Sequence, residues 1–565
     1  MKIFYVLLCA FNMSFAQSIY PTDYFRKPLD IELVTSGTFG ELRSNHFHAG
    51  IDFKTKQKQG LNVYAAAEGY VSRIKISHYG YGKALYITHP NGYVTVYAHL
   101  KRFSDKIEKY IKDCQYQRET YEVEVFLNPS ELKIFKDEIV AFSGNTGSSG
   151  GAHLHFEIRD NEERPINPML FGINVRDTRK PLVTALYGYP LDPDARINGK
   201  NKPTQIRLIP LKNGNFKTED ITAIGPVGFG VVSYDRQDLA NNKNGVSNIS
   251  TFFNGSKNFE IDFKRFRFDE GKHINRLIDY KAFKKRKTRI QKLFLEPNTP
   301  LSLYKNTIKE GKLNVEDSTD ILYKVEIKDF KGNQTDISVH INGKKSKIKN
   351  LKDTKSKDDL SLIKYNQTTT FNEGPYEVNF FPQTVYENEY IDFRVSSDTL
   401  FLGKDLIPLQ KKFNIKFDIT NYKKEHQDKL FIAKLWGYYQ TPNYIPTKRK
   451  DNELISYSKT LGTFAVVMDT IPPNISPVNF KDKQWLSKSK FLKVKISDKL
   501  TGIRSYRATV NGKWILMEYE HKTKTLTHDF NDGVVKDTEN KLKVIVTDNV
   551  GNNTTFESTF YRKNL

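Results

Sequence analysis

Histidines at the spacing of β-strand faces are the feature that most limits how this chain folds. Seven of its twelve histidines lie between residues 46 and 155. His48 precedes Asp52 by four positions, and His153 precedes His155 by two. Successive side chains of a strand point to opposite faces, so residues an even number apart share a face. Each pair therefore points toward one place, which indicates a bound metal ion.

Apolar residues fill the positions between these polar ones. They are Phe47, Ala49, Ile51 and Phe53 in the first segment and Leu154, Phe156 and Ile158 in the second. This alternation predicts two half-buried strands whose apolar faces cover a core and whose imidazoles face away from it. It does not decide which of His153 and His155 is a metal ligand.

The first 16 residues have the features of a secretory signal peptide. One positive charge, at Lys2, precedes a short apolar stretch, and the small residues Ser14 and Ala16 stand where a signal peptidase would cut. The stretch is too short to cross a bilayer of roughly 30 Å. We therefore expect a secreted protein of the periplasm or cell envelope with no transmembrane segment.

The chain is strongly basic, with a formal charge of +23. Such a balance favours an anionic partner such as cell-wall polymer, lipopolysaccharide, membrane or nucleic acid, although ordinary solvated lysines would produce it too. No basic helix, zinc-finger spacing or RNA-binding signature focuses the charge, which argues against nucleic acid.

Once the signal is removed, Cys114 is the only cysteine. No intrachain disulfide is then possible.

A repeated motif divides the rest of the chain. Residues 177–181 (Asp-Thr-Arg-Lys-Pro) recur at 469–473 (Asp-Thr-Ile-Pro-Pro), and each copy is followed by Asp-x-x-Gly-Asn, at 329–333 and 548–552. The repeat predicts β-modules with the same opening and closing turns. We expect a mainly β protein: a signal peptide (1–16), a small antiparallel β-domain (17–175), an Ig-like β-sandwich with insertions (176–343), a linker (344–359), a β-rich domain (360–468) and an Ig-like β-sandwich (469–565).

Two imidazoles and a carboxylate suit zinc. Catalytic zinc sites usually have three protein ligands and an open position for water, whose pKa the metal lowers to about 7. His48, Asp52 and either His153 or His155 would form such a set. A further histidine could accept the proton of the water, and another could stabilise the oxyanion. A single His-x-His is more often ordinary surface or packing, so the hypothesis depends on the sets occurring together, with Tyr97-Ala98-His99 between them.

Two other features have plainer interpretations. His46, His78 and His89 are interpreted as ordinary surface or turn residues. His46 is the first candidate for an exception, because it lies close to His48 in sequence. The glycine-rich segment 144–151 lacks the Gly-Lys-Ser/Thr ending of a phosphate-binding loop, which argues against nucleotide binding. Close approach of its backbone to a ligand, or a flexible connection, fits better.

Residues 39–173 resemble the lysostaphin-like (LytM-type) zinc metallopeptidases, which cut the peptide part of peptidoglycan. The matching segments are Gly40-Glu41-Leu42-Arg43, His48-Ala49-Gly50-Ile51-Asp52-Phe53, Val63-Tyr64-Ala65-Ala66, Gly69-Tyr70-Val71, Gly80-Tyr81-Gly82, Tyr97-Ala98-His99-Leu100, Gly144-Asn145-Thr146-Gly147 and His153-Leu154-His155-Phe156-Glu157. The resemblance covers about a quarter of the chain. Ala152 departs from it, because many members have proline there.

The resemblance implies a role for each polar residue, and a metallopeptidase fold for residues 17–175. Its three zinc ligands would be His48, Asp52 and His155. His153 matches the general base, and His99 matches the histidine that polarises the scissile carbonyl and steadies the oxyanion. Tyr97 and Asn145 are expected to line the substrate groove.

Three functions follow from these observations. All ligand and catalytic positions are intact, which favours a secreted zinc-dependent endopeptidase that hydrolyses stem peptides or cross-links of peptidoglycan through a zinc-activated water. The family also contains members that have lost zinc ligands and activate cell-wall amidases, so a catalytically silent regulator is the rival. An envelope-binding scaffold, with a protein partner bound through the β-modules, is compatible with the first.

Overall fold

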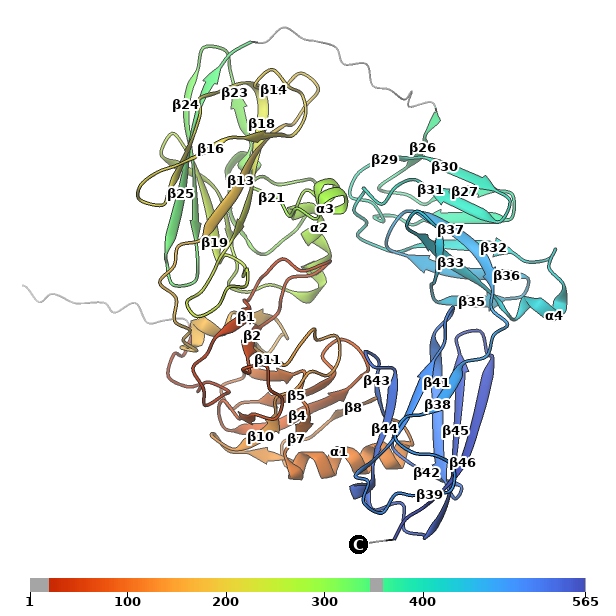
Figure 1. Ribbon diagram of the computed structural model, residues 1–565. Coiled ribbons are helices and arrows are strands. Elements are labelled where there is room, and N and C mark those ends of the chain that lie inside the picture. The colour runs from red at the N-terminus through yellow and green to blue at the C-terminus, as the bar shows by residue number, and fades with distance from the viewer. Residues whose placement is uncertain (1–19, 346–358, 564–565) are drawn as a thin grey trace, which may run out of the picture.

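The structure is a computed structural model that describes residues 20–345 and 359–563. It is mainly β, and its sheets follow one another in four regions along the chain (Figure 1). The predicted signal peptide, and positions 346–358 of the predicted linker, lie outside the described residues. In the described part, no helix is both long and apolar enough to span a membrane.

The N-terminal region contains a large sheet, a small sheet and the longest of the described helices, α1 (Asp105–Arg118). The large sheet has the order β1 (Thr35–Gly37), β2 (Ile51–Lys54), β11 (His153–Arg159), β6 (Val94–Ala98), β5 (Lys83–Thr88), β4 (Gly69–Ile76), β8 (Val123–Phe126), with β12 (Pro165–Ile166) beside β11 and β9 (Lys133–Ile134) beside β4. The small sheet has the order β3 (Asn62–Tyr64), β10 (Ile139–Phe142), β7 (Arg102–Phe103), and a short helix, η1 (Pro168–Phe171), follows β12. Ile107 and Ile111 of α1 are fully buried in the core of this region.

The expected strand around His48 forms only in part. β2 begins at Ile51, so His48 lies in the short irregular segment between the Leu42–Phe47 bridge and that strand. The alternating apolar residues are all buried, but they divide between two cores. Ile51 and Phe53 belong to the core of the N-terminal region, whereas Phe47 and Ala49 belong to the core of the next region. The histidine is therefore held between two packed interiors.

Residues 182–343 form the first β-module, whose strands join one extended sheet system. The strands are β13 (Leu182–Pro190), β14 (Arg196–Ile197), β15 (Thr204–Ile206), β16 (Leu208–Pro210), β17 (Phe216–Thr218), β18 (Ile221–Tyr234), β19 (Asn248–Phe253), β20 (Ser256–Asp262), β21 (Gln291–Lys292), β22 (Tyr304–Thr307), β23 (Leu313–Val315), β24 (Asp320–Lys328) and β25 (Gln334–Gly343). The helices are η2 (Phe268–His273), α2 (Ile274–Leu277), α3 (Tyr280–Arg286) and η3 (Ile308–Gly311). Phe263 and Phe266 of this module pack on the ring of Phe47, at centroid distances of 6.2 and 5.5 Å.

The middle β-region pairs its strands in three sheets. They are β26 (Ser361–Ile363) with β29 (Glu389–Ile391); β27 (Thr369–Glu373), β28 (Tyr376–Phe380), β32 (Phe413–Asp418), β36 (Glu453–Ser458) and β35 (Thr447–Lys450); and β30 (Phe393–Ser396), β31 (Thr399–Leu402), β37 (Thr463–Met468), β33 (Leu430–Trp436) and β34 (Thr441–Tyr444). A short helix, α4 (Lys424–Gln427), precedes β33.

The C-terminal module has two sheets that share one core. They are β38 (Asn474–Pro477), β40 (Phe491–Ser497), β44 (Thr525–Asp529) and β43 (Glu518–Glu520); and β39 (Gln484–Trp485), β46 (Asn553–Tyr561), β45 (Glu539–Asp548), β41 (Ile503–Val510) and β42 (Lys513–Trp514). A short helix, η5 (Phe530–Asp532), follows β44.

The repeated motif makes the same hydrogen bonds in the first and last modules. In the first module the amide of Asp329 donates to the carbonyl of Asn333 at 3.1 Å, and Asn333 Nδ2 donates to the carbonyl of Asp177 at 3.3 Å. The C-terminal module repeats both bonds, each at 2.9 Å, with Asp548, Asn552 and Asp469. The closing turn of each module is thereby tied to its opening segment.

The C-terminal module returns to the N-terminal region, so the four regions form a closed circuit (Figure 1). Lys83, which is 3% exposed, places its ammonium 2.9 and 3.1 Å from the two carboxylate oxygens of Glu518. On α1, Lys112 and Tyr116 each donate to the carboxylate of Asp532 at 2.7 Å. Burial lowers the pKa of Lys83, but the charge of Glu518 outweighs it and leaves the pKa raised.

Replacing Glu518 should weaken the attachment of the C-terminal module. Glu518→Ala would leave the buried Lys83 ammonium without its partner; because Glu518 is itself 41% exposed, we expect a loss of about 1–3 kcal/mol. We expect a lower urea midpoint and faster proteolysis between the middle region and the C-terminal module. Glu557→Ala is the matched control, since its 3.1 Å pair with Lys543 is exposed and worth under about 1 kcal/mol. Equal effects of the two substitutions would contradict this account of the interface.

Candidate metal centre

Three potential ligand atoms converge where β2 meets β11. Asp52 and His155 are directly opposite in this antiparallel pair, so their side chains project from the same face. His48 Nε2 is 3.0 Å from Asp52 Oδ1 and 3.1 Å from His155 Nδ1, and the last two atoms are 2.8 Å apart. The three residues are buried. The group could hold a metal ion.

The spacing and the charge of the group both fit a cation. Bonds of about 2.0–2.1 Å to a tetrahedral ion place ligand atoms about 3.3 Å apart, close to the separations here. Burial alone lowers the pKa of His155, but hydrogen bonds to Asp52 and Glu157 outweigh it and raise the pKa to about 9. Burial raises the pKa of Asp52, yet the histidines around it hold the pKa well below its usual range. The centre therefore stabilises positive charge.

Hydrogen bonds on the far side of each ring determine which nitrogen faces the centre. His48 Nδ1 donates to the carbonyl of Thr38 at 2.8 Å, which leaves Nε2 as a ligand atom. His155 Nε2 donates to Glu157 Oε1 at 2.7 Å, which leaves Nδ1. Such partners fix the tautomer and orientation of a ligating imidazole. Sequence reasoning did not identify them: Glu157 had a signal, the continued alternation after His155, but a backbone carbonyl such as that of Thr38 has none.

Glu157 also makes β11 differ from the half-buried strand that the sequence predicts. It is fully buried, and its carboxylate accepts from Arg159 Nε at 2.6 Å and from the hydroxyl of Tyr81. Burial raises the pKa of Glu157, but Arg159 and His155 outweigh it and lower the pKa to about 2. The ring of Phe268, from the first β-module, lies 4.6 Å from the Arg159 guanidinium. The polar face is buried because its side chains satisfy one another.

His99 and His153 lie beside the three ligand residues. Their ring centroids are 4.7 Å apart, and His153 Nε2 is 3.5 Å from Asp52 Oδ1. His99 Nδ1 donates to the carbonyl of Thr146 at 2.9 Å, and His153 Nδ1 donates to that of Gly151 at 2.8 Å. Each neutral ring therefore presents the lone pair of Nε2. Burial, the largest influence, lowers the pKa of His99 to about 3, so this ring is neutral at physiological pH.

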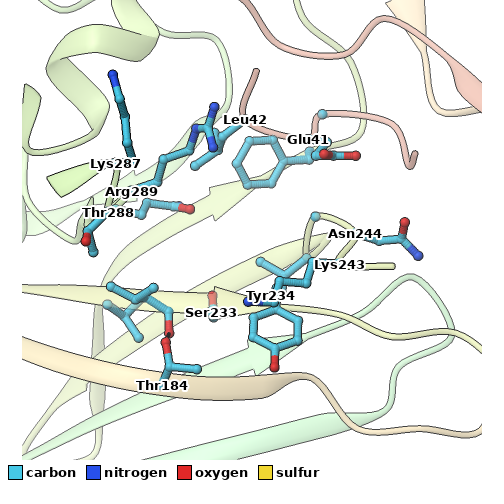
Figure 2. A pocket seen from close by; sticks show the side chains of 17 residues that line it. Glu41, Leu42, Thr184, Ser233, Tyr234, Lys243, Asn244, Lys287, Thr288 and Arg289 are labelled. Atoms are coloured by element: carbon cyan, nitrogen blue, oxygen red, sulfur yellow. Dashed lines mark hydrogen bonds between the residues drawn. The ribbon is translucent and has the colours of Figure 1, made fainter. Parts of the chain in front are cut away.

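Arg43 engages the second oxygen of the Asp52 carboxylate. Its Nη2 is 3.1 Å from Asp52 Oδ2 and 3.3 Å from Glu41 Oε2. A cavity of about 380 Å³ is lined on one side by Gly40, Glu41 and Leu42 and on the other by the first β-module. Figure 2 shows Glu41 and Leu42 facing Ser233 and Tyr234 across it. The three ligand residues do not line this cavity.

Tyr97 does not line a groove, contrary to the expectation. Its side chain is fully buried, and its hydroxyl accepts hydrogen bonds from the amide of Ala66 at 2.8 Å and from Thr95 Oγ1 at 3.2 Å. β6 is a central strand that is buried on both faces, so a tyrosine there packs in the core. Tyr81 reaches the centre instead, with its ring 5.1 Å from that of His155.

The other histidines stay outside the centre. His46 is exposed and is not among the three converging residues. His89 is 3% exposed and so is not a surface residue; its Nε2 lies 2.8 Å from Thr95 Oγ1. His78 packs against Tyr519 of the C-terminal module, with ring centroids 5.3 Å apart.

The glycine-rich loop approaches a neighbouring loop closely. Gly147 has φ +68°, and a Cβ there would lie 2.3 Å from the amide nitrogen of Gly82. Ser148 N also donates to the carbonyl of Gly80 at 2.8 Å. Only glycine fits this contact, and the adjacent residue, Thr146, holds His99 in place.

The C-terminal module touches both of these loops. Lys522 donates its ammonium to the backbone carbonyl of Asn145, and the ring of His521 lies 4.7 Å from that of Tyr79. Oδ1 of Asn145 is buried and has no hydrogen-bond donor among the described residues. Its predicted contact with substrate stays a prediction.

Sequence comparisons associate this site with peptidases. Residues 46–116 match the family described as Peptidase family M23, and residues 360–469 match a Zu5-like domain. DD-carboxypeptidase/endopeptidase Mpg of Neisseria meningitidis serogroup B (strain MC58) is 34% identical over 128 residues, which are 23% of this chain and 23% of that protein. An uncharacterized metalloprotease of Haemophilus influenzae is 33% identical over 122 residues, covering 22% of this chain and 20% of that protein.

The catalytic domain of the antimicrobial peptidase lysostaphin from Staphylococcus simulans has 22% identity and a TM-score of 0.19, covering 25% of this chain and 91% of that one. This chain spans less than a quarter of the length of the curated relatives named above. The N-terminal region is a β-sheet domain with a potential metal centre, and residues 46–116 within it are similar to Peptidase family M23.

Removing the charge of Glu157 should weaken metal binding. Glu157→Gln keeps the size of the side chain but weakens its hold on His155, and losing such a partner typically lowers metal affinity 10- to 100-fold. Competition with a zinc-binding dye would measure the change. Glu163→Gln is the control, because Glu163 pairs with the same Arg159, at 2.7 Å. It should change affinity less than about twofold; an equal loss in both variants would assign the effect to Arg159.

Proposed function

We propose that this chain is a secreted zinc-dependent endopeptidase that hydrolyses peptide bonds in the stems or cross-links of peptidoglycan. The observation that carries the proposal is the convergence of His48, Asp52 and His155 beside two histidines, His99 and His153, each of which uses Nδ1 to donate to a carbonyl and so has Nε2 as its proton-accepting atom. Two imidazoles and a carboxylate form a usual ligand set for catalytic zinc. The similarity to Mpg, named as a DD-carboxypeptidase/endopeptidase, supports a peptidoglycan substrate.

The zinc ion and the two neighbouring histidines have separate roles in the proposed hydrolysis. When bound, zinc supplies a Lewis acid that polarises a carbonyl and acidifies a water molecule. His153 accepts the proton of the attacking water at Nε2 and delivers it to the leaving amine, while its Nδ1 stays bound to Gly151. His99 likewise donates its Nδ1 proton to the carbonyl of Thr146, so its Nε2 carries the lone pair. With a pKa of about 3 its Nε2 stays unprotonated, so His99 accepts a hydrogen bond from the attacking water beside His153 rather than donating one to an oxyanion.

Several features support action at the cell envelope. The first 16 residues have the composition of a signal peptide, and the basic charge suits an anionic wall. The three regions that follow the peptidase domain offer surfaces for the wall or for an envelope protein. Raised salt should weaken attachment to the wall, since charges on exposed surfaces are screened over about 8–10 Å.

Two substitutions separate metal binding from catalysis. His153→Ala should lower the release of fragments from purified peptidoglycan sacculi by about 10²-fold or more and retain zinc, because it removes the proton acceptor but no ligand. Asp52→Ala should lose both zinc and activity. Mass spectrometry of the fragments and metal analysis of the protein measure the two effects. His46→Ala, an exposed histidine beside the centre, is the control and should match the unmodified chain.

The rival function, an amidase-activating regulator, makes opposite predictions. Such a regulator would be purified without metal, would release no fragments by itself, and would be indifferent to a chelator. Zinc retained by the Asp52→Ala variant would also contradict the ligand assignment.

A scaffold function is tested by truncation, and the packing determines where to cut. Removing everything after residue 175 would expose Phe39, Phe47 and Ala49, which are buried with the first β-module. That truncation should lose activity by loosening the segment at His48. A chain that ends at residue 345 keeps this packing. Cutting activity that persists in it would assign the later regions to attachment rather than to catalysis.

A further inference from the structure

A second cluster of acidic side chains lies away from the candidate zinc site, where the peptidase domain meets the first β-module. Asp177, Asp235 and Asp329 each offer a carboxylate oxygen, and these oxygens all lie within 4.8 Å of one another. Asp177 follows the last residues of the peptidase core, Asp235 follows β18, and Asp329 follows β24. Asp235 is 2% exposed and Asp329 is 4% exposed.

The cluster has more negative charge than its neighbours neutralise. Oδ1 of Asp235 is buried without a hydrogen-bond partner among the described residues, although the Asp235 side chain also shares a hydrogen bond with the neighbouring carboxyl of Asp177. The nearest arginine in sequence, Arg176, pairs with Asp238 instead, at 3.3 Å. Burial, followed by repulsion from the other carboxylates, raises the pKa of Asp235 to about 8. Burial is also the main reason that the pKa of Asp177 rises to about 6.

The corresponding cluster of the C-terminal module is different. Asp469, Asp498 and Asp548 are equally close, but donors surround them. Asp498 Oδ1 accepts from the amides of Leu500, Thr501 and Gly502 at 3.1, 2.8 and 2.6 Å. The hydroxyl of Thr501 donates to Asp469 at 2.9 Å. The motif carboxylates are bonded alike in both modules, since Asp329 accepts from Asn333 as Asp548 accepts from Asn552. The two clusters differ in their third member: Asp498 is surrounded by donors, whereas Asp235 has an orphaned oxygen.

We propose that Asp177, Asp235 and Asp329 bind a calcium ion that joins the peptidase domain to the first β-module. Calcium is bound by oxygen ligands at 2.3–2.6 Å, so oxygens on one ion lie at most about 5 Å apart. The carboxylates meet that limit, and the orphaned oxygen of Asp235 gains a partner. No histidine or cysteine belongs to the cluster, which separates its chemistry from that of the zinc site.

The calcium site is connected to the candidate zinc site through one loop. Asp235 and Asn244 exchange two backbone hydrogen bonds of 2.9 Å, and the amide of Gly245, next in sequence, donates to Thr38 Oγ1 at 3.0 Å. The carbonyl of Thr38 accepts the hydrogen bond that orients His48. Calcium would therefore stabilise the loop that supports a zinc-ligand segment.

Calorimetric titration of calcium chloride into the zinc-loaded full chain, in calcium-free buffer, tests the proposal. We expect one saturable site and, at about 100 times the dissociation constant, a rise in melting temperature of roughly 5 °C. Asp235→Asn should abolish both. Without calcium this variant should be at least as stable as the unmodified chain, because the neutral amide relieves the crowding of buried carboxyl groups in the cluster. A purely structural role for Asp235 would predict lower stability instead.

Two controls and a second variant complete the test. Asp194→Asn, an exposed site in the same module, and Asp498→Asn in the C-terminal cluster should keep calcium binding. Asp177→Asn should lose it, and this variant serves if Asp235→Asn does not fold. The proposal is overturned if the unmodified chain binds no calcium, if Asp177→Asn and Asp235→Asn bind it normally, or if magnesium chloride alone binds at the site.

Discussion

The cross-strand pairing of Asp52 with His155 is the contact on which the rest of this site depends. Opposite positions in an antiparallel ladder bring a carboxylate and an imidazole together without any loop having to order them. His48 completes the group from an irregular segment, and that segment needs support from outside the sheet. Support comes from Thr38 at the ring nitrogen and from the first β-module, which buries Phe47 and Ala49.

The first and last β-modules therefore support the segments that form the candidate metal site. The first one shares its core with the segment that carries a candidate ligand. The last one returns to α1 and contacts the loops beside His99, through Lys522 and His521. A domain that covers about a quarter of the sequence is thus held from two sides, and changes in either module are expected to reach it. This explains why cutting the chain at the end of the peptidase domain is a poor test of catalysis.

Much of the fold and of the site could be predicted from sequence, for definite physical reasons. Period-2 alternation identified β11, and the mainly β class followed from short strands and turns. The groove-lining role that the family resemblance implied for Tyr97 was wrong, because β6 is a central strand buried on both faces and this side chain belongs to the core. The alternation was wrong about the half-buried character of β11. Pattern alone does not reveal that His155, Glu157 and Arg159 satisfy one another within the interior.

Other features had no local signal. Thr38 orients His48 through its backbone carbonyl, which has no side-chain signal in the sequence. Lys83 pairs with Glu518, which is more than 400 positions away, so no local motif predicts that contact. The repeat at Asp177 and Asp469 was visible in sequence, yet only the structure distinguishes a satisfied cluster from an unsatisfied one.

Anomalous diffraction at the zinc edge, from crystals of the full zinc-loaded chain, tests the central claim most directly. The account predicts one peak within about 2.2 Å of His48 Nε2, Asp52 Oδ1 and His155 Nδ1. A peak elsewhere would contradict it. So would the absence of a peak at these three atoms in protein that has been saturated with zinc.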